Sequence, residues 1–340
     1  MGAMGRVVVC VTGVGGPAGF NCIRSLRDSG LDARIVAMDM DPQAAGFYHE
    51  SDVSYVVPPA TSEEFILTLF KIIEREKVDV LIPTVDEEIS VLCREPVLDR
   101  LSRLTNFLLP SQAAAGKALD KSRTISEARR AGLPVPKTLV AASRADLERK
   151  SRRVGFPLVV KPSRSRGARG ISYVDEKRDL GKAWSAASQV GGEVLLQEYV
   201  PGPVFTVGTV SGRDGRIVAS IVLQKTKEIP QTGGVAVAGK TVANPALQEL
   251  GEKYVSCLGW CGPASPEVKL DERDGGYKLM EVNPRLFGYN YLAARSGVNL
   301  AAITVRLALG EDVQPVRNYT EGLSFVRAPY DLIVEGRIGD

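Results

Sequence analysis

Histidine and cysteine are scarce in this chain, and their scarcity argues against several kinds of site. The 340 residues include one histidine, His49, and five cysteines, none of which forms a Cys-x-x-Cys pair. A zinc site and a disulfide framework are therefore poorly supported, and we expect reduced, mostly buried thiols. The chain also offers no Ser-His-acid arrangement for nucleophilic catalysis.

Long apolar runs and a strong charge imbalance are missing as well. No stretch approaches the roughly 20 apolar residues needed to cross a bilayer. The segment after Arg6 is a short Val-rich strand rather than the leader of a signal peptide. The net charge of +3 gives no indication of nucleic acid or of an anionic membrane as a partner. We therefore expect a cytoplasmic protein whose partners are small molecules.

The size and composition are those of a soluble globular protein. Hydrophobic residues make up 44% of the chain and charged residues 24%. A chain of this length has room for two or three packed units with substantial cores. We find no internal repeat and no low-complexity linker, which predicts domains in close contact.

Short buried strands alternate with helices in the first third of the chain. The expected strands span 6–11, 34–38, 55–57 and 78–83, and the expected helices span 21–29 and 63–76. This alternation predicts a parallel α/β sheet in a domain of residues 1–112.

A glycine-rich turn follows the first strand. Gly13, Gly15 and Gly16 allow the tight turn and close helix approach that a phosphate site requires, but plain strand–helix packing requires the same. Asp39 and Asp41 end the second strand, where a dinucleotide fold places its ribose acid. A lone glycine fingerprint is weak evidence, so a structural or substrate-lining role is favoured over NAD binding.

The next segment predicts a lid. A basic helix is expected from residue 113 to 131, a second helix at 144–154, and a buried strand at 156–162 that delivers Lys161 at its end. The small, basic loop from Ser163 to Ile171 then leads into a strand at 172–174, so its glycines lie at the tip of a hairpin. Backbone amides of this loop, together with Arg169, are suited to close over phosphates. The lid is expected to span residues 113–195.

Antiparallel strands dominate the rest of the chain. A meander is expected from strands at 194–200, 205–211, 216–224 and 235–237, and a hairpin from strands at 266–271 and 277–282. The expected helices span 244–258 and 291–309, the second interrupted near Gly297. This pattern predicts a subdomain of residues 196–320, followed by a tail at 321–340 with one strand at 323–327.

Polar residues gather where the last strand of the hairpin ends. Glu281 and Asn283 are two residues apart and share a face of the strand, and Glu267 lies on the facing strand. Two carboxylates so close repel each other unless a cation neutralises them, and with the amide they form an oxygen-only set suited to Mg²⁺. The alternative is a strand edge with solvated acids and an Asn-Pro turn.

Three cations, Lys121, Lys161 and Arg285, each lie at an element boundary. Fixed cations of this number suit a triphosphate of about four negative charges together with magnesium. Taken singly, each is more typical of a solvated surface charge. Lys161 fits that interpretation least, because it follows five apolar residues and precedes Pro162.

A series of short motifs runs in order along the chain. It comprises Asp-Lys121, Val-Val-Lys161-Pro, Gly167-Ala-Arg-Gly170-Ile, Gln197-Glu198-Tyr-Val-Pro-Gly202, Glu267 and Glu281-Val-Asn-Pro-Arg285. The series closely resembles the ATP-grasp superfamily, especially its carbamoyl-phosphate-synthase-like and amino-acid-ligase branches, over about residues 4–310. The resemblance implies an α/β and α+β fold, with an N-terminal parallel α/β (pre-ATP-grasp, Rossmann-like) domain and a two-part ATP-grasp domain with a mobile lid.

By that likeness the chain binds ATP and Mg²⁺. The implied phosphate ligands are Lys121 and Lys161, with Gly167, Arg169 and Gly170 in the lid. The implied adenine hinge consists of Gln197, Glu198, Tyr199 and Val200. The implied Mg²⁺ ligands are Glu267, Glu281 and Asn283, and the catalytic cations are Arg285 and Lys161.

The resemblance implies an ATP-dependent carboxylate-amine (or carboxylate-thiol) ligase that forms an acylphosphate from a small carboxylate, with an amino acid favoured. The expected substrate contacts are Gly15, Gly16, Thr84, Asp86, Glu87, Lys225, Lys227, Thr232, Gly233, Gly234, Tyr289 and Asn290. Lys225 and Lys227 are expected on one strand face, as a carboxylate anchor or as a solvated pair. Whether the chain forms a homodimer stays open.

Two positions depart from the family pattern. Val204 stands where relatives usually have a ribose-binding Glu, and Leu-Phe-Gly288-Tyr-Asn290 stands where they commonly have Gly-Gly-Ser. Three alternatives therefore remain: a carbamoyl- or acyl-phosphate-forming kinase on the same scaffold, a non-catalytic nucleotide-binding protein, and a dinucleotide oxidoreductase.

Overall fold

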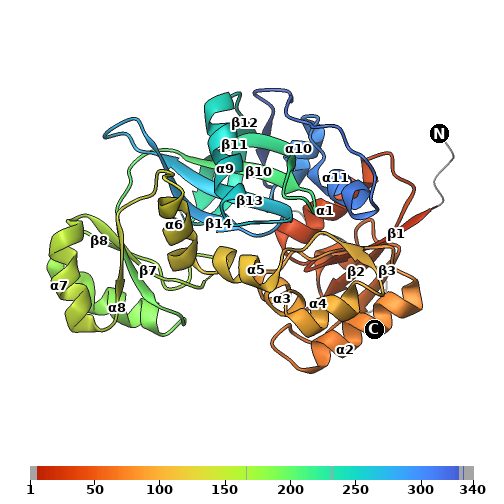
Figure 1. Cartoon of the computed structure of the whole chain (residues 1–340), viewed down its shortest axis with the longest axis horizontal. Coiled ribbons are helices and arrows are strands. Elements are labelled where there is room, and N and C mark those ends of the chain that lie inside the picture. The colour runs from red at the N-terminus through yellow and green to blue at the C-terminus, as the bar shows by residue number, and fades with distance from the viewer. Residues whose placement is uncertain (1–5, 166, 231–232, 329–331, 333–340) are drawn as a thin grey trace.

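The computed structural model describes residues 6–165, 167–230, 233–328 and 332, and these residues form three β-sheets. The sheets lie in separate parts of the molecule and are connected in chain order (Figure 1). In the described ranges no helix has the length and apolarity required to span a membrane.

The first sheet is parallel, as predicted, with strand order β3-β2-β1-β4-β5. Its strands are β1 (Val7–Thr12), β2 (Ala33–Asp39), β3 (Val53–Val56), β4 (Val80–Ile82) and β5 (Asn106–Phe107). The helices are α1 (Pro17–Arg27), α2 (Glu64–Glu76), α3 (Asp86–Leu92) and α4 (Glu95–Leu101), with a 3-10 turn at Ala45–Phe47. The strand order reverses between β1 and β4, and the loops that follow these two strands form the crevice where open α/β sheets bind ligands.

The glycine turn allows these two loops to touch. Gly13 has a φ of +63°, and a Cβ built on it would lie 2.4 Å from Cγ2 of Val85 in the loop after β4. A Cβ on Gly19 in α1 would lie 2.5 Å from the Gly13 carbonyl oxygen. The glycines therefore serve close packing of turn, helix and neighbouring loop.

The lid sheet is antiparallel, with strand order β6-β9-β7-β8. Its strands are β6 (Thr138–Ala141), β7 (Leu158–Pro162), β8 (Ser172–Val174) and β9 (Val194–Glu198). Helices α7 (Arg144–Val154) and α8 (Leu180–Ser188) pack on it, and a 3-10 turn spans Lys177–Asp179. The lid lies at one end of the molecule, as Figure 1 shows.

Two helices, α5 (Gln112–Ala118) and α6 (Lys121–Arg130), precede the lid where one continuous helix was expected. The expectation was wrong because the Asp120 carboxylate accepts hydrogen bonds from the amides of Ser122 and Arg123 and so begins a new helix. Lys121 therefore lies in the first turn of α6, at the edge of the site rather than in mid-helix.

The third sheet has the order β14-β13-β10-β11-β12-β15, and its neighbouring strands are antiparallel. The strands are β10 (Val204–Ser211), β11 (Ile217–Ile229), β12 (Val235–Thr241), β13 (Gly262–Leu270), β14 (Tyr277–Asn283) and β15 (Ser324–Val326). The helices are α9 (Pro245–Ser256), α10 (Asn290–Arg295) and α11 (Leu300–Ala308), so the predicted interruption near Gly297 is confirmed.

The first domain and the third sheet share their hydrophobic cores, whereas the lid sheet has a small core of its own. One shared cluster joins Phe65 of α2 to Tyr254 of α9, and another joins Ile23 of α1 to Leu300 of α11. The lid cluster, around Leu158 and Leu196, contains no residue of the other two. On one side of the site the first domain and the third sheet are packed against each other through shared cores, and on the other side the lid sheet is packed only around its own core.

Asn290 ties the first domain to the third sheet. Its side chain is 1% exposed, and Nδ2 donates to the carbonyl oxygens of Ala18 (3.0 Å) and Phe287 (2.8 Å). Its Oδ1 accepts from the Ser25 hydroxyl at 3.1 Å. The expected role of Asn290 as a substrate contact is therefore not supported, because its amide is used inside the protein.

Replacing Asn290 by alanine should lower the free energy of unfolding by about 1–3 kcal/mol, since buried carbonyl groups lose their donor. Urea unfolding monitored by circular dichroism measures this. Asn318→Ala is the matched control: Asn318 is exposed, and its change should stay within about 0.5 kcal/mol. Equal effects of the two substitutions would contradict the assigned role.

Candidate functional site

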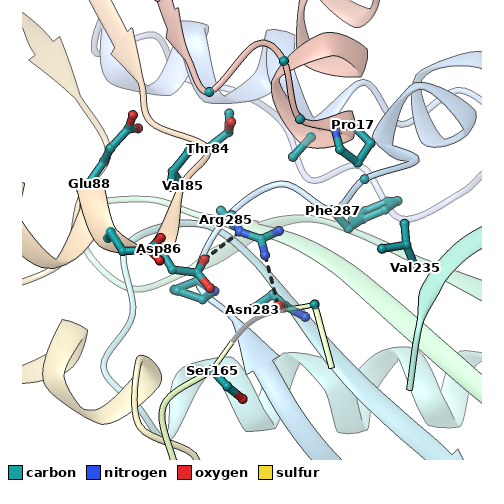
Figure 2. A pocket seen from close by; sticks show the side chains of 18 of the residues that line it. Pro17, Thr84, Val85, Asp86, Glu88, Ser165, Val235, Asn283, Arg285 and Phe287 are labelled. Carbon is teal, nitrogen blue, oxygen red and sulfur yellow. Dashed lines mark hydrogen bonds and ion pairs between the residues drawn. The ribbon is translucent and has the colours of Figure 1, made fainter. Parts of the chain in front are cut away.

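A cavity of about 1040 Å³ lies between the first domain, the lid loop and the third sheet. Its walls are the loops after β1, β2 and β4, the lid loop around Gly167, and the ends of β11, β12 and β14. Figure 2 shows side chains of these parts converging on the same space. Such a volume is ample for a substrate of nucleotide size.

Two carboxylates lie side by side on the wall of the third sheet. Glu267 of β13 pairs in register with Glu281 of β14, which confirms the expectation that they occupy neighbouring strands. The Asn283 amide donates to Glu267 Oε1 at 3.3 Å and to Glu281 Oε1 at 3.4 Å. The structure thus brings together the three oxygen-bearing side chains implied as metal ligands.

Each of these carboxylates holds a lysine. Lys121 Nζ lies 3.3 Å from Glu281 Oε2, and Lys225 Nζ lies 2.7 Å from Glu267 Oε2. Burial raises the pKa of Glu267, and the nearby Glu281 adds to this rise although Lys225 opposes it. For Glu281 burial also acts to raise the pKa, but the charges of Lys121, Lys161 and Lys225 together lower the pKa to about 2. At least one full negative charge therefore persists in the pair.

The protein supplies too few ligands for a closed metal centre at this place. Among the described residues no group of three or more His, Cys, Asp or Glu side chains could hold a metal ion. Two acids and one amide leave several coordination positions of a hard cation to water and substrate oxygens.

Lys161 is buried, close enough to the two acids to interact with both electrostatically. Its side chain donates to Gln197 Oε1 at 3.0 Å and to the Met280 carbonyl oxygen at 3.4 Å. Burial, and then the charge of Lys121, lower the pKa of Lys161 to about 8, although Glu281 and Glu267 act in the opposite direction. Its hydrogen-bond partners are neutral, and Lys161 is not among the residues that line the cavity, so its contact with a phosphate stays a prediction.

Arg285 extends from the end of β14 toward the first domain. Its Nε donates to Asp86 Oδ1 at 2.6 Å, and its Nη2 donates to Asn283 Oδ1 at 3.4 Å (Figure 2). Burial acts to lower the pKa of Arg285, but the charge and hydrogen bond of Asp86, together with the charges of Glu281 and Glu267, raise it overall. Arg285, the expected phosphoryl contact, is therefore hydrogen-bonded directly to Asp86, an expected substrate contact.

The lid loop reaches the site through its backbone. Gly167, Ala168 and Gly170 adopt positive φ angles of +60°, +60° and +75°. The carbonyl oxygen of Ser165 accepts from Lys121 Nζ at 2.8 Å, so that lysine contacts the lid and Glu281 at once. Gly167 and Arg169 line the cavity, whereas Gly170 is not among its lining residues.

The implied adenine hinge lies away from this cavity. None of the described lining residues comes from 197–200. The Glu198 carboxylate accepts from the Lys137 amide at 2.9 Å, and the Val200 carbonyl oxygen accepts from Lys269 Nζ at 2.6 Å. The hinge groups are thus bonded within the protein, and their contact with a base stays a prediction.

Most of the expected substrate contacts meet in the cavity. The lining includes Gly15, Gly16, Thr84, Asp86, Glu87, Lys225, Gly233, Gly234 and Tyr289. The Tyr289 hydroxyl donates to Thr206 Oγ1 at 2.6 Å, so its ring rather than a free hydroxyl is offered to the cavity. Thr232 lies outside the described residues.

The expectation that Lys225 and Lys227 share a strand face is wrong. Lys225 pairs with Gly239 but Lys227 pairs with Ala238, so Thr226 is an extra residue in a β-bulge. The bulge turns the exposed Lys227 to the other face, outside the cavity lining. Lys225 stays in the cavity wall, and its side chain is only 6% exposed.

Sequence reasoning missed one acid that shapes the site, Glu228, and expected a different role for a second, Asp39. Glu228 Oε1 accepts from Lys225 Nζ at 3.0 Å, and this contact depends on the bulge, which leaves no mark in the sequence. Asp39 Oδ2 accepts from the Gly15 amide at 2.7 Å. The acid expected to bind ribose in a dinucleotide fold instead braces the glycine turn, which weakens the oxidoreductase alternative.

A parallel sheet followed by two antiparallel sheets, with paired acids and lysines at their junction, defines an ATP-grasp fold. The chain belongs to the ATP-grasp superfamily, through the family described as "Carbamoyl-phosphate synthase L chain, ATP binding domain", whose model matches residues 120–316. A second model, "PylC-like, N-terminal domain", matches residues 14–97. The chain is accordingly an enzyme of the ATP-grasp ligase type, a superfamily that binds ATP with Mg²⁺.

Curated relatives match the chain in two ways. A D-alanine--D-alanine ligase of Stutzerimonas stutzeri is 29% identical over 180 residues, which are 50% of this chain and 56% of that protein. A carbamoyl phosphate synthase large chain of Pyrococcus furiosus is 25% identical over 326 residues, which are 90% of this chain and 30% of that protein. The match thus spans about half of the first relative's length and less of the second's.

Solved structures share the fold at low identity. Biotin carboxylase from Campylobacter jejuni has a TM-score of 0.71 at 20% identity, covering 92% of this chain and 73% of that chain. N5-carboxyaminoimidazole synthetase from Staphylococcus aureus has a TM-score of 0.70 at 13% identity, covering 91% and 79%. The biotin carboxylase domain dimer of Hydrogenobacter thermophilus 2-oxoglutarate carboxylase, in complex with MgADP, has a TM-score of 0.72 at 18% identity, covering 92% and 72%.

The pKa of Lys161 predicts a pH dependence of nucleotide binding. Since its pKa is lowered to about 8, the ammonium is present below pH 8 and is lost as the pH rises through that value. The affinity for Mg-ATP should then fall by up to about tenfold per pH unit above pH 8. Isothermal titration calorimetry between pH 7 and 9 measures this, and Lys161→Arg should show a flat profile over the same range. A flat wild-type profile would contradict the assignment.

Proposed function

We propose that the chain is an ATP-dependent carboxylate-amine (or carboxylate-thiol) ligase that activates a small carboxylate, with an amino acid the favoured acid. The observation that carries the proposal is the pair of adjacent carboxylates, Glu267 and Glu281, each held by a lysine at the wall of a large cavity. The cavity extends from these acids to the loops of the first domain, so it has room for a second substrate beside a nucleotide.

The donor set fits Mg²⁺. Glu267 and Glu281 are hard oxygen donors in register, Asn283 contacts both, and two ammonium groups now balance their charge. These three side chains would hold the ion, which when bound neutralises charge on the phosphoryl oxygens. Lys121, which lies 3.3 Å from Glu281 Oε2 at the cavity wall, would then be available to a phosphate oxygen.

The cations around the acids fit a triphosphate. Lys121 bridges the lid and Glu281, Lys161 is buried beside neutral partners, and Arg285 extends along the cavity wall. Together they would balance about three negative charges in a partly buried place, where electrostatic interactions are stronger than in water. The backbone amides of the lid loop are suited to cover the same phosphates.

The proposed reaction has two steps. A carboxylate oxygen of the substrate forms a bond to the γ-phosphorus of ATP while the bond to the ADP oxygen breaks, which gives an acylphosphate and ADP. An amine nitrogen, or a thiol sulfur, then attacks the acyl carbon, inorganic phosphate leaves, and the nucleophile loses a proton. Lys161 and Arg285 would stabilise the charge that develops on the transferred group.

The substrate wall is distinctive in this chain. Phe287, Gly288 and Tyr289 line the cavity beside the glycine turn of the first domain. The Tyr289 ring stacks on Phe325 with centroids 5.0 Å apart, so this wall is apolar and firmly packed. The D-alanine--D-alanine ligases, named for joining amino acids, support an amino acid as substrate without identifying it.

A carbamoyl- or acyl-phosphate-forming kinase is the second candidate. The match to a carbamoyl phosphate synthase large chain over 90% of this chain favours it. The two candidates differ in their need for a nucleophile: a kinase releases ADP without an added amine, whereas the ligase requires one. We further propose that the protein acts in the cytoplasm on small molecules; light scattering decides between a monomer and a homodimer.

The test of this function is a phosphate- and ADP-release screen with Mg²⁺ and ATP. Amino acids and small carboxylates are added singly and in pairs, with and without amines. Release that requires both an acid and an amine supports the ligase, and ADP release with an acid alone supports the kinase. No release with any combination would refute both and favour a non-catalytic nucleotide-binding protein.

Glu281→Gln should lower the turnover number by at least about 100-fold, because a neutral amide holds Mg²⁺ poorly and leaves Lys121 without its carboxylate. Steady-state ADP release measures the loss, and the melting temperature reports folding. Glu249→Gln, on the exposed side of α9, is the matched control and should keep wild-type turnover. If Glu281→Gln stays within threefold of wild type, the metal site has been placed wrongly.

A further inference from the structure

Arg285 and Asp86 form an ion pair across the junction of two sheets. Arg285 follows β14 of the third sheet, and Asp86 is the first residue of α3 in the first domain, 199 positions earlier in the chain. The Nε to Oδ1 distance is 2.6 Å, and the side chains are 19% and 21% exposed. This contact links the first domain directly to a cation implied in phosphoryl transfer.

The loop that carries Asp86 is firmly held. The Thr84 hydroxyl donates to the Thr12 carbonyl oxygen at 2.7 Å, and the Thr84 amide donates to Thr12 Oγ1 at 3.3 Å. Thr12 Oγ1 in turn donates to the buried Glu88 carboxylate. Val85 packs against the glycine turn at Gly13. Residues on both sides of Asp86 in the chain, Thr84 and Glu88, are therefore hydrogen-bonded to Thr12 and hold Asp86 in place.

The pair fixes which edge of the guanidinium faces the cavity. Nε is committed to Asp86, Nη2 donates to Asn283 Oδ1 at 3.4 Å, and Nη1 donates to the Leu286 carbonyl oxygen at 3.3 Å. A guanidinium has five N–H groups, so two remain for a ligand while the Asp86 contact is kept. Arg285 can thus hold Asp86 and a phosphate oxygen at the same time.

Asp86 also keeps Arg285 apart from the paired acids. Glu281 and Glu267 both attract the guanidinium, and their charges contribute to the raised pKa of Arg285 after that of Asp86. Without Asp86, the strongest remaining attraction on the guanidinium comes from these two carboxylates. An arginine seated on them would take the place of the metal ion.

We propose that Asp86 is a positioning residue that orients the Arg285 guanidinium for phosphoryl transfer. The ATP-grasp part is then incomplete without the first domain, which lines part of the cavity and sets the orientation of a catalytic cation. The inference rests on the proposed function, because it assigns Asp86 a role in the same reaction.

The test is a double-mutant cycle on the full chain, with Asp86→Asn, Arg285→Ala and the combined variant. Asp86→Asn should lower kcat by about 10- to 100-fold and change the KM for ATP by less than threefold, because orientation matters most for the transferred group. In the Arg285→Ala background, Asp86→Asn should lower kcat by less than a further twofold. A merely structural role would lower the melting temperature without this split between kcat and KM.

Two further variants complete the test. Asp86→Glu keeps the charge but displaces it, so kcat should fall by about three- to tenfold; this variant decides the matter if Asp86→Asn does not fold. Glu95→Gln is the control, because Glu95 is an exposed acid of the first domain outside the cavity lining. Unchanged kcat in Asp86→Asn or Asp86→Glu, or losses that multiply fully with Arg285→Ala, would overturn the proposal.

Failure of the proposed function gives a different result. If wild type releases no ADP with any substrate, the ligase and kinase hypotheses fall, and the positioning role of Asp86 in phosphoryl transfer falls with them. If wild type releases ADP and kcat is unchanged in Asp86→Asn and Asp86→Glu, the positioning role alone is overturned and the proposed function stands.

Discussion

The site depends on two carboxylates that share one small region. Glu267 and Glu281 are held next to each other by the register of two antiparallel strands, and the sheet provides no way for them to separate. Their mutual repulsion is balanced by Lys121 from α6 and Lys225 from β11. The two lysines therefore compensate the negative charge of the two acids. In the proposed complex a divalent cation would compensate the same charge.

Much of the fold followed from the sequence because its signals are local. The alternation of strands and helices predicted the parallel sheet, and the strand pattern predicted the hairpin of β13 and β14. The strand at 194–200 was expected in the meander, but β9 pairs with β6 and β7 in the lid sheet. Short elements such as α3, α4 and β5 escaped prediction, since two or seven residues carry too little periodicity. The start of α6 at Asp120 was missed because side-chain capping overrode a continuous helical pattern.

The site was harder to predict, because its contacts join distant residues. The sequence predicted that Glu267, Glu281 and Asn283 lie close together, as they do in the structure. It gave no indication that Asp86 would form a hydrogen bond with Arg285. A single extra residue at Thr226 reversed the expected face of Lys227, and only the register of the folded sheet reveals it. Asn290 carries a polar side chain next to a substrate wall, yet tertiary packing uses it to join helices.

The separate core of the lid sheet has a thermodynamic consequence. A unit that shares few apolar contacts with its neighbours can open without the rest of the protein unfolding, so the lid forms a cooperative unit of its own. Amide hydrogens of β7 and β9 then exchange with solvent at a lower free-energy cost than those of β1 or β10, whose clusters span two sheets. Opening of the lid sheet alone would therefore leave the two larger clusters intact.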